Sequence, residues 1–80
     1  MSCRSLRNEI ISSLIAVSEG MIQKARLNVE VYLHNPVGIG EHPDVLAAIQ
    51  DQIDVIAHEE ERIQVLNKHF SEHKHEEWTA

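Results

Sequence analysis

The segment from His34 to Asp44 constrains the fold most, because it places two prolines and two glycines between two long stretches of helical periodicity. Pro36 disfavours helical backbone at the preceding Asn35, and the two glycines permit positive φ. The second proline suits the first turn of a following helix. These features predict a sharp reversal over residues 34–43, and the residues assigned to the turn are Asn35, Pro36, Gly38, Gly40, Pro43 and Asp44.

Apolar residues before the turn recur with helical spacing, which predicts a first helix over about residues 5–33. They form two neighbouring lines, which are Leu6, Ile10, Leu14, Val17 and Met21, and Ile11, Ile15, Ile22, Val29 and Leu33. Together the lines are broader than a two-stranded coiled coil needs, so this helix should contact more than its hairpin mate. Gly20 lies in its middle, either as a tolerated surface glycine or at a close helix crossing.

After the turn, a heptad pattern predicts a second helix over about residues 43–70, followed by a polar tail over residues 71–80. Glu60 and Asn67 interrupt the apolar heptad positions. We expect Asn67 to lie where the seam opens to water, whereas Glu60 fits either that position or a role in fixing register. Trp78 is the one large apolar residue of the tail, and it either contributes nothing or anchors on a neighbouring subunit.

The matched lengths of the two helices, about 42 Å each at 1.5 Å per residue, favour antiparallel packing. The fold class is therefore all-α, an antiparallel two-helix hairpin forming one domain. Alignment from the turn places Val17 near Ile63, Arg7 toward Glu72, and Arg26 toward Asp51 or Asp54. With 80 residues and one cysteine, the chain cannot hide its apolar surface or staple it, so we expect a homo-oligomeric bundle. The predicted hairpin and oligomer interface comprises Ile10, Leu14, Val17, Met21, Leu46, Ile49, Ile53, Ile56, Ile63 and Phe70.

The net charge of −6 is unevenly distributed, because residues 1–34 carry four basic and three acidic groups and residues 35–80 carry three and ten. A nucleic-acid partner is therefore not expected, since phosphate contacts require a basic face. The apolar run Ile10–Val17 is too short for a membrane span and contains two serines. A lone Cys3 fits a reducing compartment. We expect a soluble cytoplasmic protein without a membrane partner.

Several residue clusters raise the question of a ligand site. The glycines of the turn precede a helix N-terminus, where an anion is favoured, but the pattern matches no phosphate-binding motif and a rigid turn is the preferred interpretation. His34, Glu41, His42 and Asp44 match no metal motif, and an alternative role for the two histidines is to cap the helix ends. His69, His73 and His75 lie near the fraying end. We therefore predict no metal and no cofactor.

Catalytic constellations are absent from the sequence pattern. His58 is followed by three glutamates, but Arg62 stands where a metalloprotease helix needs its second histidine. No serine or cysteine has a base at a defined spacing, so we do not expect an enzyme. The candidates for a weak small-ligand site are Lys24, Arg26 and Tyr32, together with Arg4 and Arg7.

The segment VYLHNPVGIGEHPDVLAAI, with the later EEERIQVLNKHF, resembles a group of short proteins of tailed bacteriophages, particularly phages of marine cyanobacteria. The resemblance covers roughly residues 28–70, and its most specific part is NPVGIGEHPD, from Asn35 to Asp44. Members of the group are small and have no assigned activity. The resemblance therefore implies a viral origin and an infected-cell cytoplasm, and supplies no functional site.

Three functional classes follow. We favour a non-enzymatic assembly or interaction protein, which associates with itself through its apolar stripes and binds a phage or host protein by a helix face. The first alternative is a soluble oligomeric binder that sequesters a small nucleotide or another host defence signal. The second alternative is a minor structural component of the virion.

Overall fold

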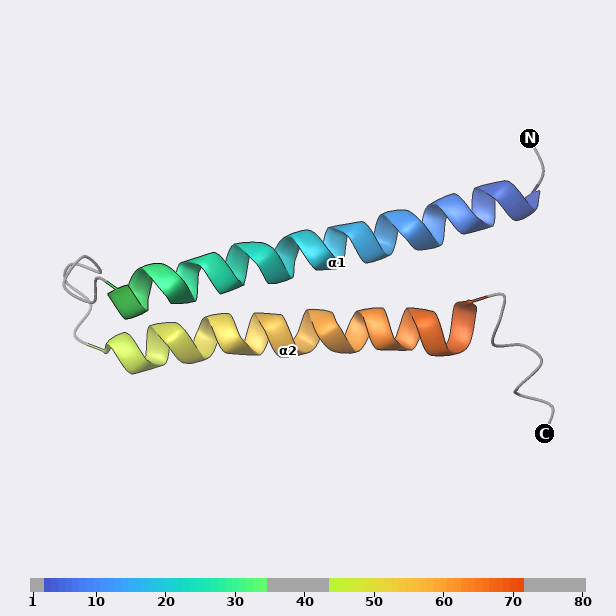
Figure 1. The fold of residues 1–80 in the computed structure, drawn as a ribbon. Helices are drawn as coiled ribbons and strands as arrows, with labels where there is room; N and C mark the ends of the chain where they lie inside the picture. The colour runs from blue at the N-terminus through green and yellow to red at the C-terminus, as the bar shows by residue number, and fades with distance from the viewer. Residues whose placement is uncertain (1–2, 35–43, 72–80) are drawn as a thin grey trace.

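The computed structural model describes residues 3–34 and 44–71, which form two antiparallel helices (Figure 1). Helix α1 spans Cys3–His34 and helix α2 spans Val45–Phe70. The predicted all-α antiparallel hairpin is confirmed. Helix α1 begins two residues before its predicted start and ends one residue later, and α2 begins two residues after its predicted start.

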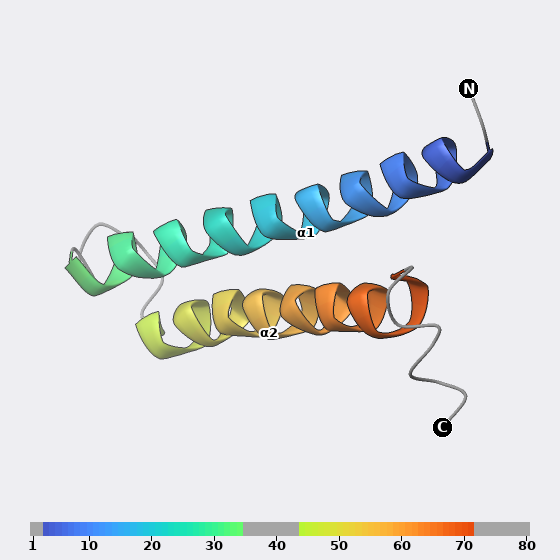
Figure 2. The same ribbon diagram turned by 45° about the vertical axis from the view of Figure 1, so that its right-hand side comes forward.

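Two long-range hydrogen bonds define the register of the hairpin. Asn28 Nδ2 donates to Gln52 Oε1 at 3.2 Å, which is the alignment that the sequence predicted for Val17 and Ile63. At the open end, Arg7 Nη2 donates to the backbone oxygen of Phe70 at 2.7 Å. Both ribbon views show the separation of the helices widening from the loop end toward this open end (Figures 1 and 2).

The surface between the helices, which we call the seam, follows a regular heptad on α1 and two adjacent lines of residues on α2. On α1 its positions, all buried or half-buried, are Ile11, Ile15, Ser18, Ile22, Ala25, Val29 and Tyr32. On α2 the corresponding positions are Val45, Ala48, Gln52, Val55, Glu59 and Leu66, with Ile49, Ile56 and Ile63 half-buried beside them. Among the described residues, Ala25 is the only buried apolar side chain, and Ser18 and Glu59 are buried as well.

On α1 the seam differs from the predicted one by a rotation of about one residue, whereas on α2 the predicted positions Ile49, Ile56 and Ile63 are half-buried. The predicted positions Ile10, Leu14, Val17 and Met21 are 40 to 64% exposed. On α2, the exposed predicted positions are Leu46, Ile53 and Phe70. Hydrophobicity selected these residues, whereas the seam accepts small and polar side chains at several positions. The prediction that these exposed residues lie in the seam between α1 and α2 is therefore wrong. Their place in an interface between copies stays a prediction.

Asp44 caps the second helix. Its side-chain Oδ1 accepts a hydrogen bond from the backbone nitrogen of Ala47 at 2.9 Å, which satisfies one of the donors that a helix N-terminus leaves free. The cap is thus Asp44, whereas the sequence also offered His42 for this role. The turn residues Asn35, Pro36, Gly38, Gly40 and Pro43, and the tail with Trp78, lie outside the described residues.

Polar residues that interrupt the helices are at the surface. Asn67 is exposed, as expected, and so is Glu60. A Cβ atom added at Gly20 would meet nothing within 4 Å. Within one hairpin, Gly20 is therefore a tolerated surface glycine and does not mark a close crossing of α1 and α2.

Candidate interaction surfaces

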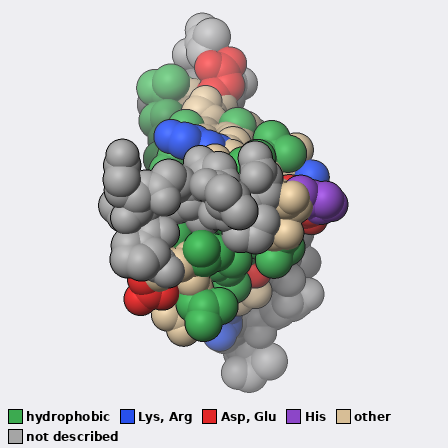
Figure 3. All heavy atoms as spheres, turned by 90° about the vertical axis from the view of Figure 1, so that its left-hand side faces the viewer, with side chains coloured by type: hydrophobic (Ala, Val, Ile, Leu, Met, Phe, Trp, Pro, Cys, Tyr) green, Lys and Arg blue, Asp and Glu red, His purple; other side chains and the backbone are tan. Residues whose placement is uncertain are grey.

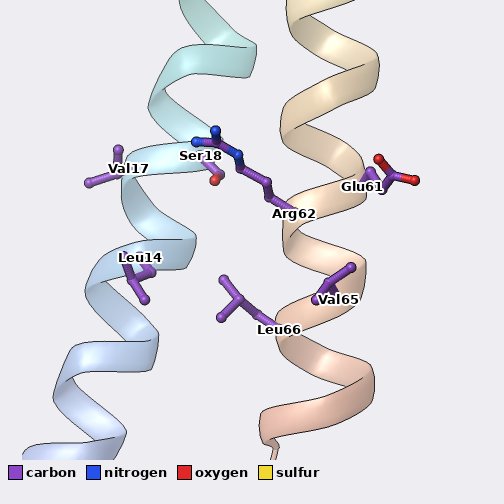
Figure 4. Close-up of a pocket in the computed structure, with 7 residues that line it drawn as sticks. All are labelled: Leu14, Val17, Ser18, Glu61, Arg62, Val65 and Leu66. Carbon is purple, nitrogen blue, oxygen red and sulfur yellow. The ribbon is translucent and has the colours of Figure 1, made fainter.

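An apolar groove runs along one face of the hairpin near its open end. It consists of two hollows of about 350 and 480 Å³ that share Leu14 and Leu66. In the first, Leu66 and Arg62 extend from α2 toward α1, whereas Val17 points away from α2 (Figure 4). The two hollows, which together we call the open-end groove, are lined by Leu6, Arg7, Ile10, Ile11, Leu14, Val17, Ser18, Glu61, Arg62, Val65, Leu66 and Phe70.

Helix α1 carries an exposed apolar stripe along this groove. The α1 stripe comprises Leu6, Ile10, Leu14, Val17 and Met21, each 40 to 64% exposed. Its last four members each precede a seam residue by one position, so they lie about 100° around the helix from the seam. In an antiparallel pair of helices, the residues one position before each seam residue lie on the same face of the hairpin in both helices. Val65 of α2 precedes the seam residue Leu66, so it lies on the same face as the α1 stripe.

Helix α2 carries a second stripe on the opposite face. We define the α2 stripe as Leu46, Ile49, Ile53 and Ile56, which follow the seam residues Val45, Ala48, Gln52 and Val55 by one position. They are therefore rotated about 100° from the seam in the other direction. Leu46 is 74% and Ile53 49% exposed, and the other two are half-buried. Hydrophobic side chains also reach the surface in the end-on view (Figure 3).

The seam itself contains an unsatisfied acid. Glu59 is 6% exposed; its Oε2 lies 3.6 Å from Nη1 of Arg62, and its Oε1 has no hydrogen-bond partner. Burying a carboxylate with one unpaired oxygen costs free energy that the half-exposed Arg62 pair offsets only in part. Sequence reasoning missed this residue, because a glutamate at a seam position runs against the hydrophobic pattern. The 3–4 spacing of Gln52, Val55 and Glu59 is the signal that would have found it.

The structure does not bring the weak ligand candidates together. Lys24 and Arg26 are exposed and two residues apart, which places them on different sides of α1. Arg26 Nε and Nη2 donate to Gln23 Oε1 of the same helix at 3.4 and 3.3 Å, whereas the sequence had aimed Arg26 at Asp51 or Asp54. Tyr32 is half-buried in the seam. Arg7 is bound to Phe70 at the open end.

Two of the histidines within the described ranges, His34 and His69, have local partners. His34 ends α1, as predicted; its Nδ1 lies 2.8 Å from the backbone oxygen of Glu30 and 3.5 Å from its Oε1. The rings of His69 and Phe70 meet edge to face at 6.3 Å. Over residues 3–34 and 44–71, no three His, Cys, Asp or Glu side chains gather as metal ligands would. Neither described helix combines the length and apolarity that a bilayer crossing requires.

Comparison with protein-family models, with curated proteins and with solved structures finds no match to this chain. The features of the described residues that bear on function are therefore the two stripes, the open-end groove and the composition of the seam.

Proposed function

We propose that the chain is a non-enzymatic assembly protein whose copies associate through their helix faces. One observation carries this proposal: the α1 stripe faces outward while the seam holds Ser18 and Glu59. A chain folding alone gains most by burying its largest apolar side chains first. Twelve large apolar residues of the described ranges remain exposed instead, and patches of this kind are typical of surfaces that another protein covers.

A second copy of this chain fits the α1 stripe. Under a two-fold axis between Ser13 and Leu14, an antiparallel α1 places Leu6 opposite Met21 of the other copy and Ile10 opposite Val17 of the other copy, with the two Leu14 side chains next to the axis. Apolar residues then meet apolar residues along the whole stripe, which is the self-complementarity that an isologous interface requires. The open-end groove provides room for the side chains of the second copy.

The broad face of the hairpin is also large enough for a stable interface. A face as long as the 26 residues of α2 extends for about 39 Å, and two packed helices are about 20 Å wide. The whole face therefore amounts to roughly 800 Å², which is the area that each partner buries in a standard protein interface, and the axis between Ser13 and Leu14 covers its open-end part.

We further propose that the chain acts in the cytoplasm of an infected cell, with a phage or host protein as a further partner of the assembled helices; the resemblance to phage proteins motivates this location and not the assembly role. No observation favours the nucleotide-binding alternative, since the hollows are lined mainly by apolar side chains and the basic candidates point in different directions. Detection of the chain in purified virions by mass spectrometry would favour the structural alternative.

Sedimentation velocity tests the proposal. We expect the wild-type chain to sediment as more than one copy at micromolar concentration, and V17D to contain fewer copies than the wild type. L27D is the matched control, because Leu27 is 51% exposed and lies on the side of α1 away from the seam and both stripes. A wild-type chain that stays monomeric at 100 times that concentration, or equal masses for V17D and L27D, would contradict the proposed function.

A further inference from the structure

We propose that the α2 stripe is a second interface, at which two dimers meet to form a closed tetramer. This inference rests on the proposed function, because it requires that copies first pair through the α1 stripe. The two stripes lie on opposite faces of the hairpin, so a dimer formed through the groove face leaves both copies of the α2 stripe exposed. Leu46, at 74%, is the most exposed large apolar residue of the described ranges.

The α2 stripe is complementary to itself under a two-fold axis. With α2 antiparallel to α2 of a second copy, Leu46 lies opposite Ile56 of that copy and Ile49 lies opposite Ile53 of that copy. The centre of this arrangement is at Asp51, next to Gln52. The stripe extends over about 15 Å, and four apolar residues from each copy would meet.

Charges on α1 match the same two-fold axis. Arg26 and Glu30 each follow a seam residue by one position, so they lie on the face of the α2 stripe. The midpoint between them is Asn28, which is bonded to Gln52 across the seam. The centre of the charges and the centre of the α2 stripe therefore fall within about one residue of each other.

This arrangement brings Arg26 of each copy beside Glu30 of the other, so that two ion pairs flank the apolar contact. Among the residues that the structure describes, the Arg26 guanidinium donates only to the neutral Gln23, and Glu30 contacts His34. A second copy therefore supplies the arginine with an acidic partner. Complementary charges at the edge of an interface mainly select the partner and its orientation.

Two different isologous interfaces on opposite faces generate a closed assembly of four copies. If the α1 stripe of one copy instead bound the α2 stripe of the next, one stripe would stay uncovered at each end of the assembly. Further copies could then add without limit. The charges favour the closed form, because Arg26 and Glu30 of one copy pair with Glu30 and Arg26 of a second copy about a two-fold axis.

Native mass spectrometry and sedimentation velocity of the full chain test this inference. We expect four copies for the wild-type chain, two for V17D, two for I53D, and one for the V17D/I53D double variant. Circular dichroism at 222 nm confirms that each variant remains helical. Each of the two interfaces is then removed separately.

Charge variants keep the test decisive even if I53D fails to fold. R26E places like charges at both pairs, so we expect the dissociation constant of the tetramer into dimers to rise about tenfold or more. The double variant R26E/E30R exchanges the two signs and should restore four copies. K24E is the matched control for the α2 stripe, because it makes the same change in net charge on the face of the α1 stripe and should leave the dissociation constant of the tetramer at the α2 stripe unchanged.

A wild-type monomer would overturn both the proposed function and this inference. A wild-type dimer that V17D dissociates and I53D leaves intact would overturn this inference alone. Failure of R26E/E30R to recover four copies, or a series of masses that grows with concentration, would also overturn it.

Discussion

The seam and the α1 stripe run side by side along the same helix. Their apolar content differs in the direction opposite to that expected, because a buried surface should be the more apolar of the two. The seam includes Ser18 and Ala25 and faces Gln52 and Glu59 of α2, whereas the stripe consists of leucine, isoleucine, valine and methionine. The more apolar of the two surfaces thus faces outward. In a hairpin, hydrophobicity alone does not decide which side of a helix packs against the other helix. The layer of two helices also has two broad outer faces, and apolar residues on these faces can be covered by other copies.

This comparison also explains why the described residues contain so little buried apolar surface. Each helix has one neighbour, so even the isoleucines of the seam remain half-exposed. Chains of this size gain stability when additional copies complete the core. We interpret the hairpin as one layer of a larger bundle, with the seam fixing register and the stripes supplying most of the association energy.

The largest effect is expected from a charge placed in the seam. I22D would put an unpaired carboxylate among half-buried side chains, and we expect it to lower the free energy of unfolding by more than about 3 kcal/mol. Urea denaturation followed by circular dichroism measures this loss. Q23D changes the exposed neighbour and should remain close to wild type. Equal stability of the two variants would show that the seam is no more important than the surface.

Removal of the buried acid should have the next largest effect, with the opposite sign. E59M replaces a carboxylate that has one unsatisfied oxygen by an apolar side chain of similar length, so we expect stabilisation by about 1 to 3 kcal/mol. E60M, at an exposed position, serves as the control. If E59M instead lowers the urea midpoint, Glu59 has a partner in the assembled protein that a single hairpin does not supply.

Loss of the helix cap should have a smaller effect that is independent of association. D44A removes the hydrogen bond to the backbone nitrogen of Ala47 and should cost about 1 kcal/mol. D54A, within α2, is the comparison. Thermal unfolding at two protein concentrations would show the same decrease at both, whereas a decrease found only at the lower concentration would assign Asp44 to an interface.

The smallest effect is expected at the outer surface of α1, away from both stripes. G20A should stabilise the chain by about 0.5 to 1 kcal/mol, because alanine favours the helix and the space around Gly20 is open. Calorimetry measures the gain, and L27A provides a comparison on the same side of the helix. A decrease in association for G20A would indicate that another helix crosses α1 closely at this glycine in the assembly.

The sequence was sufficient for the architecture. Its turn residues separated two helices of matched length, and pairing from the loop outward gave the register that Asn28 and Gln52 adopt. These features depend on the backbone preferences of individual residues and on the lengths of the two helical segments. Both can be read directly from the sequence. The end of α1 at His34 and the start of α2 beside Asp44 follow from the same local rules.

The orientation of each helix about its own axis could not be obtained in the same way. Periodicity shows which residues share a side, but two adjacent apolar lines on α1 gave no criterion for which line meets α2. The small and polar seam residues Ser18, Ala25 and Glu59 settle this in the structure. Their contribution depends on how closely two backbones approach, and that distance is not encoded in the hydrophobicity of single residues.

The hydrogen bond from Arg7 to the last carbonyl of α2 links the two ends of the molecule that lie farthest from the loop. A positively charged group at a helix C-terminus stabilises its final turn, and here that group belongs to the other helix. Fraying of the last turn of α2 and unzipping of the two free ends are therefore one event. Amide hydrogen exchange should report both with the same opening rate.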